Sequence, residues 1–249
     1  MVVPLLAVDR LTKRYGHVTV ADGLSLEVAA GEAVGVVGPN GAGKTTLFAL
    51  IAGEQAPDAG TLALNGRPLA GMSAAARCRL GIGRTYQVPR PFTHLTVFEN
   101  ALLAAHQGAG LRGRAAYAAA AGALAAAGLS ALANRQAGAL TLLRRKRLEL
   151  ARALATGPRL LLLDEVAGGL TDPEVHELME IIRQVHASGV AVIWIEHVVR
   201  ALTGTVPRLV CLAGGTIVGD GPPAEVLASP AVREVYLGGA LELAGTGET

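Results

Sequence analysis

The sequence predicts an α/β fold built on a parallel sheet, with an antiparallel β part and an inserted helical part. A glycine-rich loop, Gly38–Thr46, lies between a short apolar segment and a helical segment. Later in the chain, apolar runs at 160–163 and 190–195 suit buried strands and flank a helical pattern near 173–187. Between these regions, stretches such as Ala115–Ala127 have the high helix propensity of alanine. We therefore expect a sheet core interrupted by a helical insertion.

The glycine-rich loop has the pattern G-x-x-x-x-G-K-S/T in a strand, loop and helix context. Residues 33–37 form the expected strand, and residues 46–52 the expected helix, which ends at Gly53. A backbone that curls at glycines can point successive N–H groups at phosphate oxygens, and a helix N-terminus adds donors and the positive end of its dipole. A chance match in a chain with 32 glycines is the alternative, and the flanking elements argue against it. The predicted nucleotide-binding residues of this loop are Gly38, Pro39, Asn40, Gly41, Ala42, Gly43, Lys44, Thr45 and Thr46. Lys44 would reach the β- and γ-phosphates, and the Thr45 hydroxyl would bind Mg²⁺.

The remaining strands follow from alternation and turn signals. Residues 5–11 and 24–28 alternate apolar with polar side chains, and residues 61–64 end at the turn signal Asn65 and Gly66. These segments predict antiparallel strands packed beside the sheet core. Residues 210–212 and 216–218 flank Gly214 and Gly215, which predicts a hairpin.

Composition limits the class of protein. The 249-residue chain is 51% hydrophobic and 17% charged, which predicts a globular fold. A formal net charge of +2 does not indicate nucleic acid, and we interpret the basic run at 144–147 as a solvated helix face. Two cysteines without metal or disulfide spacing are typical of a reducing cytosol. No apolar run reaches the ~20 residues of a membrane span, so we expect any membrane contact to be made through a partner.

Two carboxylates follow the apolar run at 160–163. Asp164 and Glu165 would lie at the carboxyl end of a parallel strand, where open α/β sheets bind ligands. A carboxylate on Mg²⁺ beside one that orients or deprotonates water suits phosphoanhydride hydrolysis. The alternative for an Asp–Glu pair is an ordinary helix N-cap. A phosphate-binding loop in the same chain favours the catalytic interpretation.

With these motifs, the chain from about residue 6 to 237 resembles the ATP-binding subunit of an ABC transporter, and within that class the branched-chain (hydrophobic) amino-acid uptake group. Further matches are Tyr15 with Val20, Gln87 after Arg84, His197 after the strand at 190–195, and the tail segments 224–226 and 236–238. The resemblance implies a P-loop NTPase (RecA-like) core at 1–87 and 156–249 that includes the antiparallel β subdomain. It also implies a helical subdomain at 88–155 that carries the signature loop.

The resemblance also implies roles for these residues. Tyr15, with Val20 beside it, would stack on adenine, and His197 would contact the γ-phosphate. Gln87 would touch Mg²⁺ and the attacking water, with Asp164 and Thr45 as the other metal ligands. Glu165 would polarise the water. Taken alone, Tyr15 suits a surface aromatic and His197 a helix-cap residue.

The signature loop departs from the family pattern. Where most members have LSGGQ, this chain has Leu140, Thr141, Leu142, Leu143 and Arg144. Thr141 keeps the hydroxyl, and Leu142 and Leu143 keep their N–H groups, but two glycines are absent, which restricts φ and adds bulk. The usual proline after Glu165 is Val166, Thr171 stands at the usual Asp of the following loop, and Val198 replaces a frequent acidic residue.

The resemblance predicts a cytoplasmic Mg-ATPase, peripheral on the inner face of the plasma membrane, that dimerises around two nucleotides and drives permease subunits without contacting nucleic acid. The dimer could be a homodimer or a heterodimer with a paralogous ATPase. A regulatory ATP-binding module with little turnover and a soluble non-transport ABC ATPase are the alternatives, and the absence of an NKxD pattern disfavours a GTPase.

Phe92 and Phe98 are expected either in the core of the helical subdomain or in a groove for a permease helix. The transported substrate is not visible in the sequence.

Overall fold

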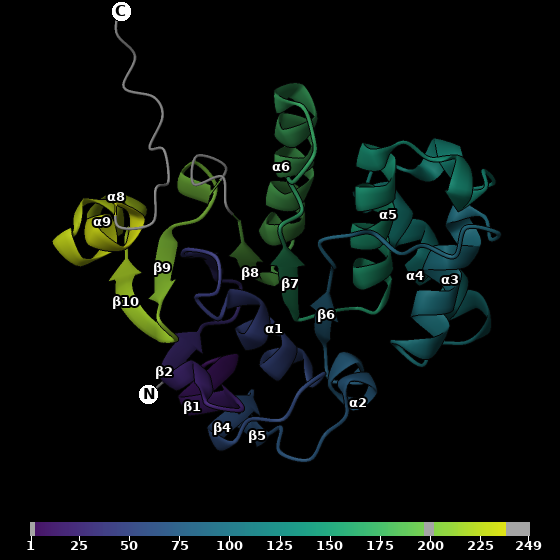
Figure 1. Cartoon of the computed structure of the whole chain (residues 1–249). Helices are drawn as coiled ribbons and strands as arrows, with labels where there is room; N and C mark the ends of the chain where they lie inside the picture. The colour runs from purple at the N-terminus through teal and green to yellow at the C-terminus, as the bar shows by residue number, and fades with distance from the viewer. Residues whose placement is uncertain (1–2, 197–201, 238–249) are drawn as a thin grey trace, which may run out of the picture.

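The computed structural model describes residues 3–196 and 202–237, and these residues form two sheets and a helical part (Figure 1). The six-stranded sheet has the order β10-β9-β3-β8-β7-β6. Its strands are β3 (Ala33–Val37), β6 (Ile82–Arg84), β7 (Leu160–Asp164), β8 (Ala191–Ile195), β9 (Arg208–Ala213) and β10 (Thr216–Gly221). All neighbours pair in parallel except β9 and β10, which form an antiparallel hairpin at Gly214 and Gly215. The predicted parallel sheet and this hairpin are confirmed.

The second sheet is antiparallel and has four strands in the order β2-β1-β4-β5. Its strands are β1 (Leu6–Tyr15), β2 (Val18–Val28), β4 (Ala59–Leu64) and β5 (Arg67–Pro68). β1 and β2 extend beyond the predicted segments, because irregular pairing lets both strands continue through their polar halves to a turn at Gly16. Asn65 and Gly66 both have positive φ, 49° and 73°, as the turn between β4 and β5 requires.

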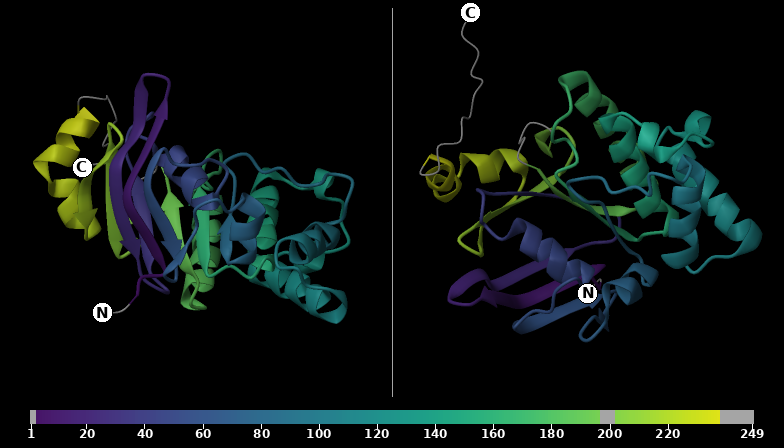
Figure 2. Two further views of the ribbon diagram at one scale, coloured as in Figure 1. Left: turned by 90° about the horizontal axis from the view of Figure 1, so that it is seen from below. Right: turned by 45° about the vertical axis from the view of Figure 1, so that its right-hand side comes forward.

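The six-stranded sheet is buried on both faces, and each face has its own hydrophobic cluster. Alternate strand residues such as Val34 and Ile193 contact α1 (Lys44–Ala52) and the antiparallel sheet. The intervening residues, such as Trp194, contact α6 (Asp172–Ala187), part of α5 (Leu142–Ala155) and the α8–α9 pair (Pro223–Ala228 and Pro230–Leu237). This double burial explains why the parallel strands are continuous apolar runs. α1 therefore lies between the two sheets (Figure 2).

The helical part consists of α3 (Val97–Gln107), α4 (Gly113–Ala126) and α5, with two short 3₁₀ turns at Ser130–Leu132 and Ala137–Ala139. Its third hydrophobic cluster is dominated by alanines, whose small side chains let the helices approach closely. A capping box formed by Thr96 and Glu99 begins α3. This part and the α8–α9 pair lie at opposite ends of the molecule (Figure 1, Figure 2).

The elements that were not predicted include α2 (Ala74–Arg79), β5, β6 and the α8–α9 pair. β6 has three residues, including Gly83, and forms only by pairing with β7, about 80 positions later in the chain. Within the described residues, no helix is both long enough and apolar enough to cross a membrane. The proposed division at 87/88 and 155/156 stays a prediction.

Candidate functional site

The glycine-rich loop connects β3 to the first turn of α1, as predicted, and two of its glycines are required by close backbone approaches. Gly38 has φ 151°, and a Cβ there would lie 2.1 Å from the Leu212 carbonyl oxygen. Gly43, which precedes α1, has φ 98°, and its Cβ would lie 2.3 Å from the Val20 carbonyl oxygen. No side chain fits at either position. The loop is therefore held between β9 and β2.

Lys44 is the first residue of α1, and its side chain is buried at 5% exposure. Its Nζ donates to the carbonyl oxygens of Gly38 and Pro39, at 2.7 and 3.0 Å. Burial lowers the pKa of Lys44, and the carboxylates of Glu165 and Asp164 oppose that shift. The ammonium group therefore lies inside the loop, beside the acidic end of β7.

A hollow of about 170 Å³ lies over the N-terminus of α1. It is lined by Val20, Asn40, Gly41, Ala42, Gly43, Lys44, Thr45, Thr46 and Glu165. This set combines backbone N–H groups at a helix N-terminus with one buried cation and the hydroxyls of Thr45 and Thr46, and groups of these kinds bind phosphate. The residues present fit a polyphosphate, and Thr45 with Asp164 supplies the oxygen ligands that Mg²⁺ accepts beside phosphate oxygens.

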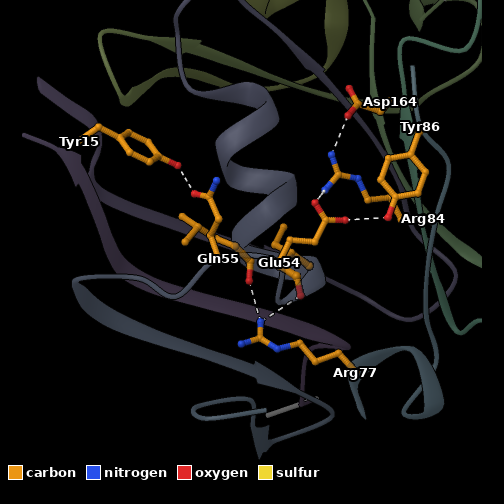
Figure 3. A network of polar contacts seen from close by, with 9 residues as sticks. Tyr15, Glu54, Gln55, Arg77, Arg84, Tyr86 and Asp164 are labelled. Carbon is orange, nitrogen blue, oxygen red and sulfur yellow. Dashed lines mark hydrogen bonds and ion pairs between the residues drawn. The ribbon is translucent and has the colours of Figure 1, made fainter. Parts of the chain in front are cut away.

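Asp164 ends β7 and is buried in an ion-pair network that the sequence analysis missed (Figure 3). Arg84 Nη2 donates to Asp164 Oδ2 at 2.9 Å, and its Nη1 donates to Glu54 Oε2 at 2.8 Å. The Tyr86 hydroxyl donates to the other oxygen of Glu54 at 2.9 Å. Burial raises the pKa of Asp164, while Arg84 lowers it. The basic residue at the end of β6 was visible in the sequence, but its pairing depends on β6 lying beside β7.

Glu165 follows β7 and lines the hollow, and its carboxylate accepts a hydrogen bond from the Gln87 side-chain amide. The structure therefore brings two predicted catalytic residues together, although they are 78 positions apart. Glu165 has φ 46°, a left-handed conformation that is uncommon for a residue with a side chain. Strained backbone of this kind is concentrated at functional sites.

Tyr15 is the last residue of β1, and it is 44% exposed. Its hydroxyl donates to Gln55, which lies just after α1 (Figure 3). Val20 lines the hollow, whereas Tyr15 is outside the set of residues that line it. The predicted adenine contact of Tyr15 therefore stays a prediction. His197 falls outside the described residues, so its predicted γ-phosphate contact also stays a prediction.

The altered signature loop forms the start of α5, away from the hollow. Thr141 is the N-cap residue, and its side chain makes no capping hydrogen bond. Leu143 is buried in the sheet core, while Leu142 is 43% exposed. Neither leucine is among the described non-glycine residues with positive φ, which are Arg10, Asn65 and Glu165. The missing glycines therefore add bulk at this helix start without forcing an unfavourable φ.

Comparison with known proteins gives a consistent result. The family described as "ABC transporter" matches residues 21–168, and that described as "Branched-chain amino acid ATP-binding cassette transporter" matches residues 216–242. The chain is 38% identical to the high-affinity branched-chain amino acid transport ATP-binding protein LivG of Salmonella typhimurium, over 94% of this chain and 98% of that protein. It is 36% identical to the lipopolysaccharide export system ATP-binding protein LptB of Acidithiobacillus ferridurans, over 94% and 97% of the two chains. Its fold is similar to the ADP conformation of MJ1267, an ATP-binding cassette of an ABC transporter, with a TM-score of 0.86, 28% identity, and coverage of 94% and 99%.

Proposed function

This chain belongs to the ABC transporter family, and from that premise we propose that it binds and hydrolyses Mg-ATP to drive an import system for branched-chain or related amino acids. The observation that carries the proposal is the hollow that is lined by both the phosphate-binding loop and Glu165. The import of amino acids is supported by the match of residues 216–242 and by the likeness to LivG. Because LptB belongs to an export system, likeness of the cassette alone does not give the direction of transport.

In the proposed nucleotide complex, the loop amides and Lys44 bind the β- and γ-phosphates. Lys44 now donates to two carbonyl oxygens of its own loop, so its ammonium group is already inside the cradle. Mg²⁺ would be held by Thr45, Asp164 and Gln87. When bound, it would neutralise the negative charge that develops on the phosphate oxygens. Asp164 is held by Arg84, so its carboxylate keeps a fixed orientation at the end of β7.

For hydrolysis, we assign Glu165 the role of polarising the attacking water. The Glu165 carboxylate lines the hollow and accepts a hydrogen bond from Gln87, which would restrict its orientation. Lys44 and the loop amides stabilise charge on the transferring phosphoryl group. Tyr15 and His197 are proposed as the adenine and γ-phosphate contacts.

The second half of each site would come from a partner cassette, either a second copy or a paralogue. The N-terminus of α5 offers Thr141 and the N–H groups of Leu142 and Leu143, in ordinary helical backbone. A regulatory module with little turnover is the second candidate. The observation in its favour is the exposed Leu142 side chain, which adds bulk to the surface that would face the partner.

The permease would dock between the sheet core and the helical part. A groove of about 280 Å³ there is lined by residues of both parts, including Tyr86 and Arg152. Phe92 is 47% exposed, with the Arg152 guanidinium 5.3 Å from its ring centre. Phe98 instead contacts Tyr117 within the helical cluster, so Phe92 is the candidate contact. Docking of this kind would place the protein at the cytoplasmic face of the membrane.

The test is phosphate release and ATP binding by the purified protein, compared with Lys44→Ala. The proposal predicts Mg-dependent release that rises when permeases are added, and loss of ATP binding in Lys44→Ala. Binding without release, with permeases and with a cassette that has an ordinary signature loop, would favour the regulatory module. Absence of ATP binding by the wild-type protein would refute both.

A further inference from the structure

A buried carboxylate, to which neither nucleotide binding nor metal binding has been assigned, stabilises the turn that contains Glu165. Glu196 directly follows β8 and is 2% exposed. Its Oε1 accepts from the Ala167 backbone N–H at 2.7 Å and from Trp194 Nε1 at 3.2 Å. One carboxylate therefore ties the chain two residues beyond Glu165 to the adjacent strand.

A buried cation reaches the same turn from the helical part. Lys146 lies in α5, four residues after Leu142, and is 5% exposed, so the interpretation of residues 144–147 as a solvated face is wrong for this side chain. Its Nζ lies 3.5 Å from the Glu165 carbonyl oxygen. Burial lowers the pKa of Lys146, and the carboxylates of Glu196 and Glu165 partly oppose that shift. Lys146 and Glu196 thus stabilise each other's charge beneath the turn.

The turn needs such support because Glu165 is in a left-handed conformation, φ 46°. For a residue with a side chain, this conformation is unfavourable and persists only where surrounding contacts enforce it. The Glu165 N–H donates to the Ile195 carbonyl at 2.9 Å, which fixes one side of the residue. The Lys146 ammonium group lies beside the Glu165 carbonyl oxygen, and Glu196 accepts the hydrogen bond from the Ala167 N–H.

Relaxation of this turn would move the Glu165 carboxylate away from the hollow. A displacement of about 1 Å at a reacting group lowers a rate on the order of 100-fold. Lys146 belongs to the helix whose first residues form the signature loop. A shift of α5 would therefore be transmitted to Glu165 through one side chain.

We propose that Glu196 and Lys146 are positioning residues that hold the Glu165 turn in its catalytic conformation and connect it to the signature helix. The inference rests on the proposed ATPase function. It predicts an effect on the hydrolysis step rather than on nucleotide binding, because neither side chain lines the hollow.

The experiment measures kcat and the ATP dissociation constant of the full-length protein and its variants. Glu196→Ala and Lys146→Met should each lower kcat at least ~10-fold, with the dissociation constant within ~3-fold of wild type. Glu196→Gln keeps an oxygen acceptor for Ala167 and loses only the charge near Lys146, so its kcat should lie between those of wild type and Glu196→Ala. The double variant Glu196→Ala with Lys146→Met should be no more than ~3-fold slower than the slower single variant, since both act through one turn.

The control for general destabilisation is Arg77→Met. Arg77 is another buried cation that donates to backbone carbonyls, those of Leu50 and Ile51 in the last turn of α1 (Figure 3) and that of Leu69. Its loss should lower the melting temperature and leave kcat within ~2-fold at 25 °C. Hydrogen exchange of a peptide covering 164–170 should be faster in Glu196→Ala and Lys146→Met and unchanged in Arg77→Met.

The inference fails if kcat stays within ~2-fold in both single variants, if the effects multiply in the double variant, or if exchange at 164–170 is unchanged. A wild-type protein that does not hydrolyse ATP would instead refute the proposed function. Hydrogen exchange would still test the support of the turn in that case, so the two failures are distinguishable.

Discussion

Arg84→Met is expected to destabilise the protein strongly, because Arg84 is the partner of the buried Asp164. The Arg84 and Asp164 side chains are 8% and 6% exposed, and their charged atoms are 2.9 Å apart. The guanidinium also pairs with Glu54, whose side chain is 33% exposed. Methionine has a similar stem and no charge, so the substitution removes both ion pairs while keeping most of the packing.

The magnitude follows from these exposures. Removing one partner of a buried ion pair costs about 3 to 5 kcal/mol, since the other charge is left unpaired. The more exposed pair with Glu54 contributes at most about 1 kcal/mol. The loss is a large fraction of a typical unfolding free energy of roughly 5 to 15 kcal/mol.

The assay is urea unfolding at several pH values. Burial already raises the pKa of Asp164 above its ordinary 3.8, and Arg84 opposes that shift, so the variant has a still higher pKa. A group whose folded pKa is raised contributes stability below its unfolded pKa and loses it as pH rises through the folded pKa. The deficit of Arg84→Met should therefore be smallest near pH 4 and grow toward neutral pH.

The double variant Arg84→Met with Asp164→Asn is the control, because it removes the unpaired charge. It should be more stable at pH 7 than Arg84→Met alone. A deficit below about 1 kcal/mol at pH 7, or one that grows as pH falls, would refute the assignment of Arg84 as the partner of a charged Asp164.

Three further predictions concern the loop, the docking groove and the signature. Gly43→Ala should lower ATP affinity, measured by calorimetric titration, at least ~10-fold, because its Cβ would lie 2.3 Å from a carbonyl oxygen. The control is Gly23→Ala, where φ is 62° and the space around the Cβ is open, so that variant should lose only about 1 kcal/mol of stability. Phe92→Ala should weaken assembly with the permeases and leave the ATPase rate of the isolated protein unchanged. Thr141→Ala should have little effect on slow hydrolysis by this chain alone, and a paralogue with an ordinary signature loop should accelerate hydrolysis at the P-loop of this chain.

Each of these predictions has a contrary outcome. Equal ATP affinity in the Gly43→Ala and Gly23→Ala variants would show that the loop accommodates a side chain at residue 43. Intact assembly and permease-coupled ATPase in Phe92→Ala would place the docking contact elsewhere. A brisk homodimer rate across protein concentrations, unchanged by a paralogue and lost in Thr141→Ala, would show that the modified loop is fully competent.

The phosphate-binding loop and the Asp164–Glu165 strand end were predictable because their signals are local. The loop needs glycines at fixed positions between a strand and a helix, and the strand is apolar since both of its faces are buried. α1 begins at Lys44, two residues earlier than predicted, because the loop itself enters the first helical turn. Boundaries of this kind depend on cap geometry, which the apolar pattern does not contain.

The rest of the site depends on contacts between distant segments. Arg84 meets Asp164 only because the three-residue β6 pairs with β7, and Glu196 meets Ala167 across two neighbouring strand ends. The sequence also suggested that the lost signature glycines would restrict φ. In the structure, the corresponding residues begin α5 with ordinary φ, so glycine is not required there for backbone conformation.

The central claim, that this chain hydrolyses ATP with Glu165 at the end of β7, is tested most directly by Glu165→Gln. Hydrolysis and ATP affinity are measured on the same preparation of the variant and the wild-type protein. The account predicts unchanged ATP affinity and turnover at least ~100-fold slower, the scale expected when a positioned base or water-orienting group is lost. Near-normal hydrolysis by Glu165→Gln would contradict the account.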